Sequence, residues 1–217
     1  MSPGTCRKSD RHFHRCGGDT RPPSRVRTVQ RFQRQMQFTP LTIPQVMRID
    51  LEPISDSRGF FARLMCCEKF RSQGINSHIQ QCNNTLTRTK GSIRGLHFQR
   101  PPRAESKIIR CVRGAVLDVA VDLRQNSETF GQFCTCELTD DNRSMLAIPP
   151  GFAHGFQTLT DDAELIYFHS ESYSPEHEGG VNPLDPAISI PWPLPVAEVS
   201  ERDTDLPGIN KVAPIKL

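Results

Sequence analysis

Long hydrophobic runs are missing from this sequence of 217 residues. A membrane-spanning helix needs about 20 consecutive apolar residues, and no segment approaches that length. Hydrophobic residues make up 36% of the chain and charged residues 24%, as in ordinary water-soluble domains. We therefore expect no membrane association and one sizeable domain with its own hydrophobic core.

Most of the chain also lacks an excess of positive charge. The net charge is +3, but residues 1–40 hold nine of the 27 basic residues and only two acids, Asp10 and Asp19. The rest of the chain has a net charge of −4. Because the basic charge belongs to the N-terminal segment, the sequence gives no electrostatic case for nucleic-acid binding by a folded domain.

The eight cysteines include no CxxC pair, the spacing of many zinc sites and redox motifs. Cys111, Cys134 and Cys136 lie in apolar stretches, where a free thiol packs as a small hydrophobic group. No secretory hydrophobic segment precedes the cysteines. We therefore expect a cytoplasmic protein with free thiols and no disulfide framework.

Residues 1–35 lack hydrophobic periodicity and are rich in Arg, Pro, Gly and Ser, which predicts a disordered basic N-terminal extension. Three interpretations of this extension remain open. It is a tail without function, an Arg-rich presequence of the transit type, or a metal site in the stretch CRKSDRHFHRC, whose spacing matches no common zinc pattern. The folded domain is expected to span residues 36–217.

From Met36 onward the sequence is dominated by short β-strand patterns. Apolar runs separated by two to four turn residues predict three hairpin-like pairs: KIIRCV with AVLDVAVDLR, GQFCTCELT with SMLAIPP, and HGFQTLT with AELIYFHSE. A short helix is expected before Gly74, and the proline-rich segment from Leu184 is expected to wrap the edge of the domain. This spacing predicts an all-β sandwich or small barrel rather than βαβ units.

Residues suited to chemistry gather in two of these stretches. His97 lies in RGLHFQ with Arg94 before it and Lys107 on the next predicted strand, and His154 lies in PPGFAHGF. A lone histidine is usually a hydrogen-bonded core residue. Here Arg94 and Lys107 accompany it, and because buried cations rarely occur unpaired, a cluster in the mouth of a barrel indicates an anionic ligand or an anion formed during a reaction.

The glycine-flanked histidine and the later PxGxxH resemble the two-part signature of cupins, which are jelly rolls of the double-stranded β-helix type. Metal-binding cupins carry a second histidine where this sequence has Gln99. A metal ion needs three or four ligands, whereas His97 and His154 supply two, and the nearby Lys107 ammonium opposes a dication. We therefore expect no metal and no other cofactor.

Tyr167 and Tyr173 are the only tyrosines. Alternation along AELIYFHSE places Leu165, Tyr167 and His169 on one face of a strand, but the sequence does not say which face points inward. A strand tyrosine is most often a packing residue with its hydroxyl at the rim. Asp203 taken alone is an ordinary loop acid.

Seven motifs, in order from about Ser55 to Asp203, closely resemble the dTDP-4-dehydrorhamnose 3,5-epimerase family. They are DSRGFF, KGSIRGLHFQ, SKIIRCVRGAVLDVAVDLR, FGQFCTCELTDDNRSMLAIPPGFAHGFQTL, AELIYFHSESYSPE, DPAISIPWP and SERD. The resemblance covers most of the chain beyond Met36. It implies a metal-free cupin homodimer with short peripheral helices, which inverts C3, C5 or both of a nucleotide-linked 4-keto-6-deoxyhexose in deoxysugar biosynthesis of the rhamnose type.

The resemblance also implies roles for ten residues. Four would be catalytic: His97 as the base, Asp203 as the carboxylate that polarises it, Tyr167 as the general acid, and Lys107 near the 4-keto oxygen. The other six would bind the substrate: Arg94 and His154 around sugar and phosphate, Arg58 at the diphosphate (often from across a dimer), Gln81 and Asn83 on the nucleotide side, and Tyr173 as an aromatic there. A non-catalytic nucleotide-sugar-binding cupin is the alternative.

This sequence departs from the family pattern at four places. Arg63 replaces an acid, Cys82 replaces the Asp of a Gln-Asp-Asn motif, and Phe168 replaces a lysine. The segment NPLDP, residues 182–186, lacks an aromatic residue and an arginine. We expect these changes to lie in or near the binding region, which predicts retained chemistry with a possible change of substrate.

Overall fold

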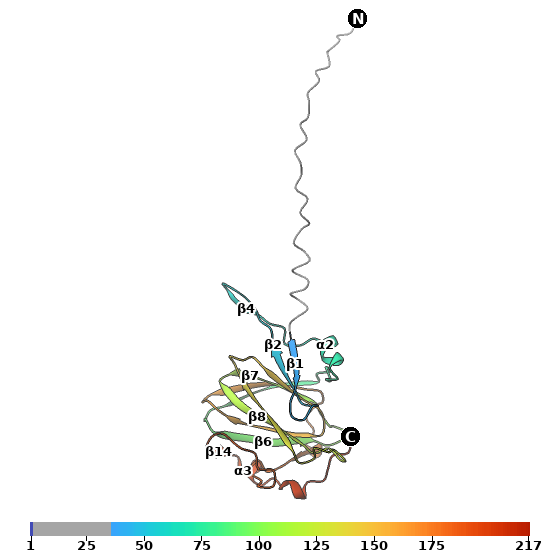
Figure 1. Ribbon diagram of the computed structural model, residues 1–217, viewed down its shortest axis with the longest axis vertical. Helices are drawn as coiled ribbons and strands as arrows, with labels where there is room; N and C mark the ends of the chain where they lie inside the picture. The colour runs from blue at the N-terminus through green and yellow to red at the C-terminus, as the bar shows by residue number, and fades with distance from the viewer. Residues whose placement is uncertain (2–35) are drawn as a thin grey trace. The chain divides into compact units, whose positions relative to one another are not determined.

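The structure, a computed structural model, describes Met1 and residues 36–217 (Figure 1). Residues 36–217 belong to one compact unit. The predicted disordered extension and its three interpretations lie outside the described residues. Within the described part of the chain, no helix is long and apolar enough to cross a membrane.

Two β-sheets form a cupin-type sandwich, as the sequence motifs predict. The first sheet has the strand order β1-β2-β10-β7-β12-β5, with bounds β1 Met36–Pro40, β2 Met47–Leu51, β10 Met145–Ile148, β7 Lys107–Arg113, β12 Ala163–His169 and β5 Gln81–Thr87. The second has the order β13-β6-β11-β8-β9, with bounds β13 Glu178–Gly180, β6 Ser92–Gln99, β11 Phe152–Thr158, β8 Ala115–Asp122 and β9 Phe133–Thr139. The short β14, Glu198–Val199, pairs with β6 in parallel.

The remaining elements are peripheral. A small hairpin of β3, Ile54–Asp56, and β4, Gly59–Phe61, projects from the sandwich (Figure 1). The helices are short: α2 Cys67–Ser72, α3 Glu201–Thr204, and the 3-10 turns η1 Pro175–His177 and η2 Ile209–Lys211. The predicted helix before Gly74 is therefore confirmed as α2.

The three predicted hairpins are wrong in their pairing, although their strands are present. Strands β7 and β8 lie in different sheets, as do β9 and β10, and β11 and β12. Strand β7 pairs with β10 and β12, while β8 pairs with β9 and β11. Each short turn carries the chain across the sandwich. An apolar run does not distinguish a neighbour in the same sheet from one in the opposite sheet, because both bury it.

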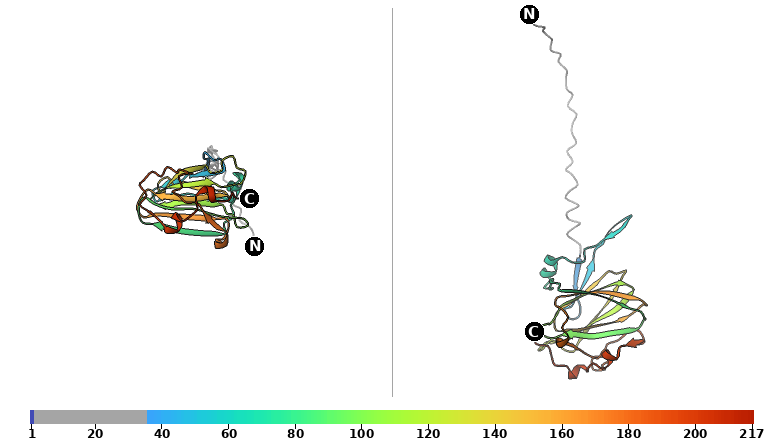
Figure 2. Two further views of the ribbon diagram at one scale, coloured as in Figure 1. Left: turned by 90° about the horizontal axis from the view of Figure 1, so that it is seen from below. Right: turned by 180° about the vertical axis from the view of Figure 1, so that it is seen from behind.

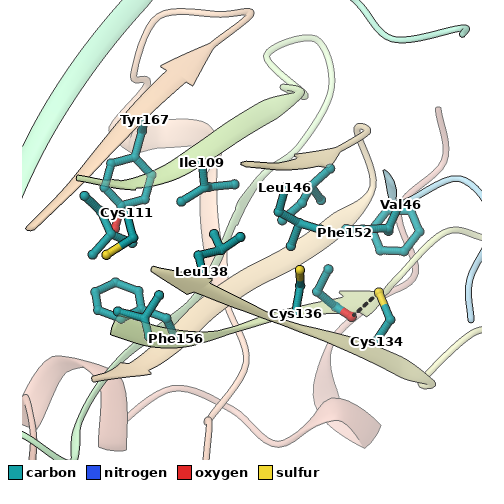
Figure 3. Packing of buried hydrophobic residues seen from close by; sticks show 14 of the residues in the cluster. Val46, Ile109, Cys111, Cys134, Cys136, Leu138, Leu146, Phe152, Phe156 and Tyr167 are labelled. Atoms are coloured by element: carbon teal, nitrogen blue, oxygen red, sulfur yellow. Dashed lines mark hydrogen bonds between the residues drawn. The ribbon is translucent and has the colours of Figure 1, made fainter. Parts of the chain in front are cut away.

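The main core lies between the two sheets. The first sheet contributes Ile109, Leu146 and Leu165, and the second contributes Leu138 and Phe156. Each is nearly inaccessible to solvent, and burial of such a side chain stabilises the fold by about 1.5–3 kcal/mol. Figure 3 shows this cluster, with Tyr167 at one end and Phe152 and Val46 at the other.

The outer faces of both sheets are also partly covered. Ile188, Ile209 and Ile215 of the C-terminal segment pack on Leu96 and neighbouring residues of the second sheet. Figure 2 shows this segment, in red, running along the side of the molecule that carries β6. On the first sheet, Phe70 of α2 packs edge-on against Phe38, with ring centroids 5.5 Å apart. The proline-rich tail therefore covers a sheet face rather than only an edge.

The six cysteines of the described part of the chain are free thiols. Cys111, Cys134 and Cys136 are buried in the main core. Burial raises the pKa of Cys111 to about 11 and that of Cys134 and Cys136 to about 12. These three thiols therefore stay protonated and act as small apolar groups, as predicted.

Candidate active site

A pocket of about 220 Å³ opens where β5, β6, β7, β11 and β12 come together. Tyr167 is both a member of the main core cluster and part of the pocket wall, so the pocket lies at one end of the core. Seven of the ten residues implied by the family resemblance line the pocket: Asn83, Arg94, His97, Lys107, His154, Tyr167 and Tyr173.

Two glycines bring the histidine-bearing strands together. His97 of β6 and His154 of β11 are directly paired in register. Gly95 has φ +116°, and a Cβ there would lie 2.6 Å from the Cα of Gly155. Only glycine fits such a close approach with this backbone conformation. The motifs RGLH and HGF therefore place both imidazoles at the same level of the sandwich.

His97 is oriented by Asp203. Its Nε2 lies 2.8 Å from Asp203 Oδ1, and the other carboxylate oxygen accepts a hydrogen bond of 3.0 Å from the Gly95 backbone N–H. A carboxylate only accepts hydrogen bonds, so neutral His97 carries its proton on Nε2 and leaves the Nδ1 lone pair available. The imidazole remains partly exposed to the pocket while Asp203 is buried.

Asp203 is held ionised by its surroundings. Ser200 is the N-cap of α3, and its hydroxyl accepts a hydrogen bond of 3.1 Å from the Asp203 backbone N–H. Burial acts to raise the pKa of Asp203, but hydrogen bonds from His97, Gly95 and Ser200 outweigh it and lower the pKa. A carboxylate in this state stabilises an imidazolium formed at His97.

The side chain of Tyr167 points inward, which settles the strand face that the sequence left open. The residue is buried, and its hydroxyl lies 3.5 Å from Thr85 Oγ1. Burial raises the pKa of the phenol well above its ordinary value. The Tyr167 ring contacts the His154 ring edge-on at a centroid distance of 6.0 Å. The structure thus presents a protonated hydroxyl in the wall of the pocket.

Lys107, the first residue of β7, is buried and paired. Its Nζ lies 3.2 Å from Glu105 Oε1 and donates a hydrogen bond of 3.2 Å to the His97 backbone carbonyl. Glu105 in turn accepts a hydrogen bond of 2.8 Å from His169. Burial acts to raise the pKa of Glu105, but these partners lower it. The pocket therefore contains a cation whose counter-ion is built into the wall.

His154 belongs to a second histidine–carboxylate pair. Its Nε2 lies 2.8 Å from Oδ1 of Asp118 on β8, and both side chains are buried. The other oxygen of Asp118 has no hydrogen-bond partner among the described residues. Full burial raises the pKa of Asp118.

The proposed nucleotide-side residues lie at the rim. Asn83 and Tyr173 line the pocket, and Gln81 joins them through hydrogen bonds to Asn83 Oδ1 and from the Tyr173 backbone N–H. Arg94 is exposed and lines the same pocket. Arg58 does not reach it: the residue lies at the turn of the β3–β4 hairpin, 88% exposed, and pairs with Asp56.

The position that carries a histidine ligand in metal cupins has a structural role here. Gln99 Nε2 donates to the carbonyls of Arg103 and Ser172, and its Oε1 accepts from the Ser174 backbone N–H at 2.7 Å. Among the described residues there is no group of three or more His, Cys, Asp and Glu side chains that could hold a metal ion. Gln99 thus fixes the loop around residues 100–106 and the segment after β12.

The sequence reasoning gave no role to several polar residues of the site, among them Glu105, Asp118 and His169. A signal existed for each. Asp118 is a charged residue inside a long apolar run, Glu105 lies two positions before Lys107, and His169 shares the inward face with Tyr167. Alternation gives the face of a side chain but not its partner on another strand, so these pairings could not be found from the sequence.

The departures from the family pattern, which we expect in or near the binding region, do not line the pocket itself. Arg63, Cys82 and Phe168 are absent from its lining within the described chain, as are residues 182–186. Cys82 and Phe168 are paired neighbours on β5 and β12, and strand alternation directs them away from the face of Tyr167. Cys82 and Phe168 nevertheless adjoin the lining residues Asn83, Tyr167 and His169 in the sequence, so these two departures lie near the pocket without lining it.

The chain is similar to one known family of proteins over most of its length. The family model described as dTDP-4-dehydrorhamnose 3,5-epimerase matches residues 40–211. The dTDP-4-dehydrorhamnose 3,5-epimerase of Sinorhizobium fredii is 40% identical over 176 residues, which cover 81% of this chain and 90% of the relative.

Two solved structures show the same fold. The dTDP-6-deoxy-D-glucose-3,5-epimerase RmlC of Legionella pneumophila, in complex with dTDP-4-keto-L-rhamnose, is similar with TM-score 0.79 and 32% identity, over 84% of this chain and 99% of that chain. The 3′-monoepimerase ChmJ of Streptomyces bikiniensis, in complex with dTDP-quinovose, has TM-score 0.74 and 35% identity, over 79% and 86%. The chain belongs to the dTDP-4-dehydrorhamnose 3,5-epimerase family of isomerases.

Proposed function

We propose that this protein epimerises a dTDP-linked 4-keto-6-deoxyhexose at C3, C5 or both, with His97 as base and Tyr167 as acid. The observation that carries this proposal is the convergence of the His97–Asp203 pair, the Tyr167 hydroxyl and the Lys107 ammonium on one pocket. The known activities of the relatives in the same family support it.

The first step is removal of a proton next to the keto group. The C4 carbonyl acidifies the hydrogens on C3 and C5, so a neutral imidazole can take one of them and leave an enolate. The Nδ1 lone pair of His97 accepts that proton, and Asp203 stabilises the resulting imidazolium through Nε2. The negative charge moves to the C4 oxygen.

Lys107 stabilises that charge. An ammonium fixed beside a developing oxyanion in a partly dehydrated pocket lowers the barrier without reorganisation during the reaction. The Glu105 counter-ion makes the burial of Lys107 tolerable in the resting enzyme. The Lys107 ammonium thus stabilises an enolate that exists only during turnover.

Tyr167 completes the inversion by protonating the same carbon from the opposite face. A phenol is a far stronger acid than the carbon beside a ketone, so this transfer is favourable even with the raised pKa of Tyr167. The phenolate then recovers a proton from water, and the His97 imidazolium returns one to water. Protons therefore balance, and no redox step is needed.

We further propose a homodimer in which Arg58 completes the partner's site. Arg58 stands on a projecting hairpin away from its own pocket, beside the exposed rings of Phe60 and Phe61. Exposed aromatic residues on such a hairpin are typical of an interface. Mixing inactive Arg58→Ala and His97→Ala proteins should restore activity, since one site of each mixed dimer has both residues. Failure of a confirmed mixed dimer to recover activity would contradict a shared site.

The protein is proposed to act in the cytoplasm. Its six described cysteines are unpaired, and Cys67 and Cys82 are exposed, which suits a reducing compartment. Cell fractionation with an antibody to the protein should recover it with cytoplasmic markers.

Product analysis tests the activity itself. The protein should convert dTDP-4-keto-6-deoxyglucose to an epimer, and NMR of the product should show inversion at C3, C5 or both. The similarity to ChmJ makes a C3-only product a specific outcome to look for. Binding of the sugar nucleotide without any conversion or exchange would instead identify a non-catalytic nucleotide-sugar-binding cupin.

A further inference from the structure

A chain of hydrogen bonds connects Lys107 to the rim of the pocket through its counter-ion Glu105 and through His169, which has no role so far. Lys107 pairs with Glu105 Oε1 at 3.2 Å, and Glu105 Oε2 lies 2.8 Å from His169 Nδ1. His169 Nε2 lies 3.4 Å from Asn83 Nδ2. Asn83 Oδ1 accepts from Gln81 Nε2 at 3.1 Å, and Gln81 Oε1 accepts from the Tyr173 backbone N–H at 3.0 Å.

Along this chain of hydrogen bonds, the role of each group as donor or acceptor determines the role of the next. An ionised Glu105 only accepts, so His169 Nδ1 must donate to it. The neutral ring then has an accepting Nε2, and the Asn83 amide must present its NH₂ group there. The carbonyl of Asn83 is consequently turned toward Gln81, whose own amide donates to it. A single histidine tautomer satisfies every link from Lys107 to the backbone of Tyr173.

His169 is held rigidly for this task. Its side chain and that of Glu105 are nearly buried, with exposed fractions of 12% and 8%. The imidazole stacks on the Tyr167 ring at a centroid distance of 6.0 Å and an interplanar angle of 20°. His169 therefore contacts Tyr167, the proposed acid, directly. It is linked through Glu105 to Lys107, the cation proposed to stabilise the oxyanion.

We propose that His169 is a positioning residue that couples the nucleotide-side groups to Lys107 through Glu105. The inference rests on the proposed function of Lys107. His169 shares the negative charge of Glu105 and so limits how tightly that carboxylate holds the ammonium. Without this donor, the buried carboxylate has one strong partner left, and its ion pair with Lys107 tightens at the expense of the enolate oxygen.

Two replacements of His169 separate hydrogen bonding from stacking. His169→Phe keeps an aromatic ring against Tyr167 but removes both nitrogens, and kcat should fall about 10-fold while KM changes less than about 3-fold. His169→Asn keeps a donor at the position of Nδ1, so kcat should stay within about 3-fold of wild type. Equal losses in the two variants, or a change in KM alone, would overturn the proposal.

A double-mutant cycle tests the route through Glu105. If His169 acts through this carboxylate, His169→Phe should cost less than about 2-fold in kcat when Glu105→Gln is already present. Independent, additive effects would show that His169 acts by another path.

The resting protein gives a readout that does not depend on turnover. Long-range ¹H–¹⁵N correlation of labelled histidine should show neutral His169 as the Nδ1–H tautomer, and an Nε2–H tautomer would refute the chain. If wild type converts no nucleotide sugar while His169 shows the Nδ1–H tautomer, the proposed function fails but the hydrogen-bond chain stands. The two failures are therefore distinguishable.

Discussion

The two histidine–carboxylate pairs of the pocket are similar in geometry and differ in electrostatics. His97–Asp203 and His154–Asp118 both have an Nε2 to Oδ1 distance of 2.8 Å, and their histidines are paired on adjacent strands. The pKa of Asp203 is lowered, whereas that of Asp118 is raised. A short distance between imidazole and carboxylate therefore does not by itself determine the chemical role of the pair.

The difference in pKa comes from the complete burial of Asp118 and from the hydrogen bond made by the second oxygen of Asp203. In Asp203 it accepts the Gly95 backbone N–H, while in the fully buried Asp118 it has no partner within the described chain. Hydrogen bonds favour the ionised form, and burial without them favours the protonated form. Asp203 thus suits stabilisation of an imidazolium during turnover, and Asp118 suits orientation of the His154 ring.

The largest expected contrast is in the activity of two matched variants. Asp203→Asn removes the charge that stabilises the His97 imidazolium, so kcat should fall about 10³-fold. Asp118→Asn removes only a support of His154 and should cost about 10-fold or less. Steady-state kinetics on both proteins checks this, with circular dichroism as the folding control. Equal losses of kcat would mean that the two pairs contribute equally to catalysis.

Replacing Lys107 should affect catalysis and stability, and the charge of Lys107 also lowers the pKa of Asp118. Lys107→Met should reduce kcat by about 10²-fold through loss of oxyanion stabilisation. It should also lower the free energy of unfolding by about 3 kcal/mol, since Glu105 loses its cation. The control is Lys107→Met with Glu105→Gln, which should recover stability but not activity. Recovery of both would remove Lys107 from the mechanism.

The two carboxylates should give stability opposite dependences on pH. Because the pKa of Asp203 is below its ordinary value of 3.8 in the folded state, its stabilisation is present above that value and lost as pH falls through the folded pKa. Asp118 has a raised pKa, so stability is highest below 3.8 and falls as pH rises toward the folded value.

Urea unfolding from pH 3 to pH 7.5 measures this contrast. Asp203→Asn should reduce the loss of stability as pH falls below 3.8. Asp118→Asn should reduce the loss of stability as pH rises above 3.8. A change of the same sign in both variants would contradict the difference between the pairs.

The smallest expected effect concerns the helix that carries Asp203. Ser200→Ala removes the N-cap of α3 and should cost about 1 kcal/mol of stability. It should lower kcat only a few-fold, because Gly95 still holds the carboxylate. Thermal unfolding and kinetics measure both, with Ser72→Ala, an exposed serine at the end of α2, as the control. A loss as large as that of Asp203→Asn would show that the cap, not the carboxylate, carries the effect.

The sequence predicted the residues of the site better than their connections. The motifs around His97, His154 and Tyr167 marked these residues as candidates without giving the inward face of the Tyr167 strand, and the structure brings them together. The partners of these residues come from distant segments, as Asp118 and Glu105 show. The strands were found but paired wrongly, because a turn as short as that at Gly114 can cross between sheets as well as form a hairpin. Arg58 lies outside the pocket of its own chain, at the turn of the β3–β4 hairpin.

Deuterium incorporation from D₂O tests the central claim most directly, because it detects proton removal by His97 whatever product is released. With dTDP-4-keto-6-deoxyglucose, wild type should incorporate deuterium at C3, C5 or both, His97→Ala should incorporate none above background, and Tyr167→Phe should exchange with little inversion. Exchange by His97→Ala at the wild-type rate, or none by wild type with any 4-keto-6-deoxy nucleotide sugar, would contradict the account.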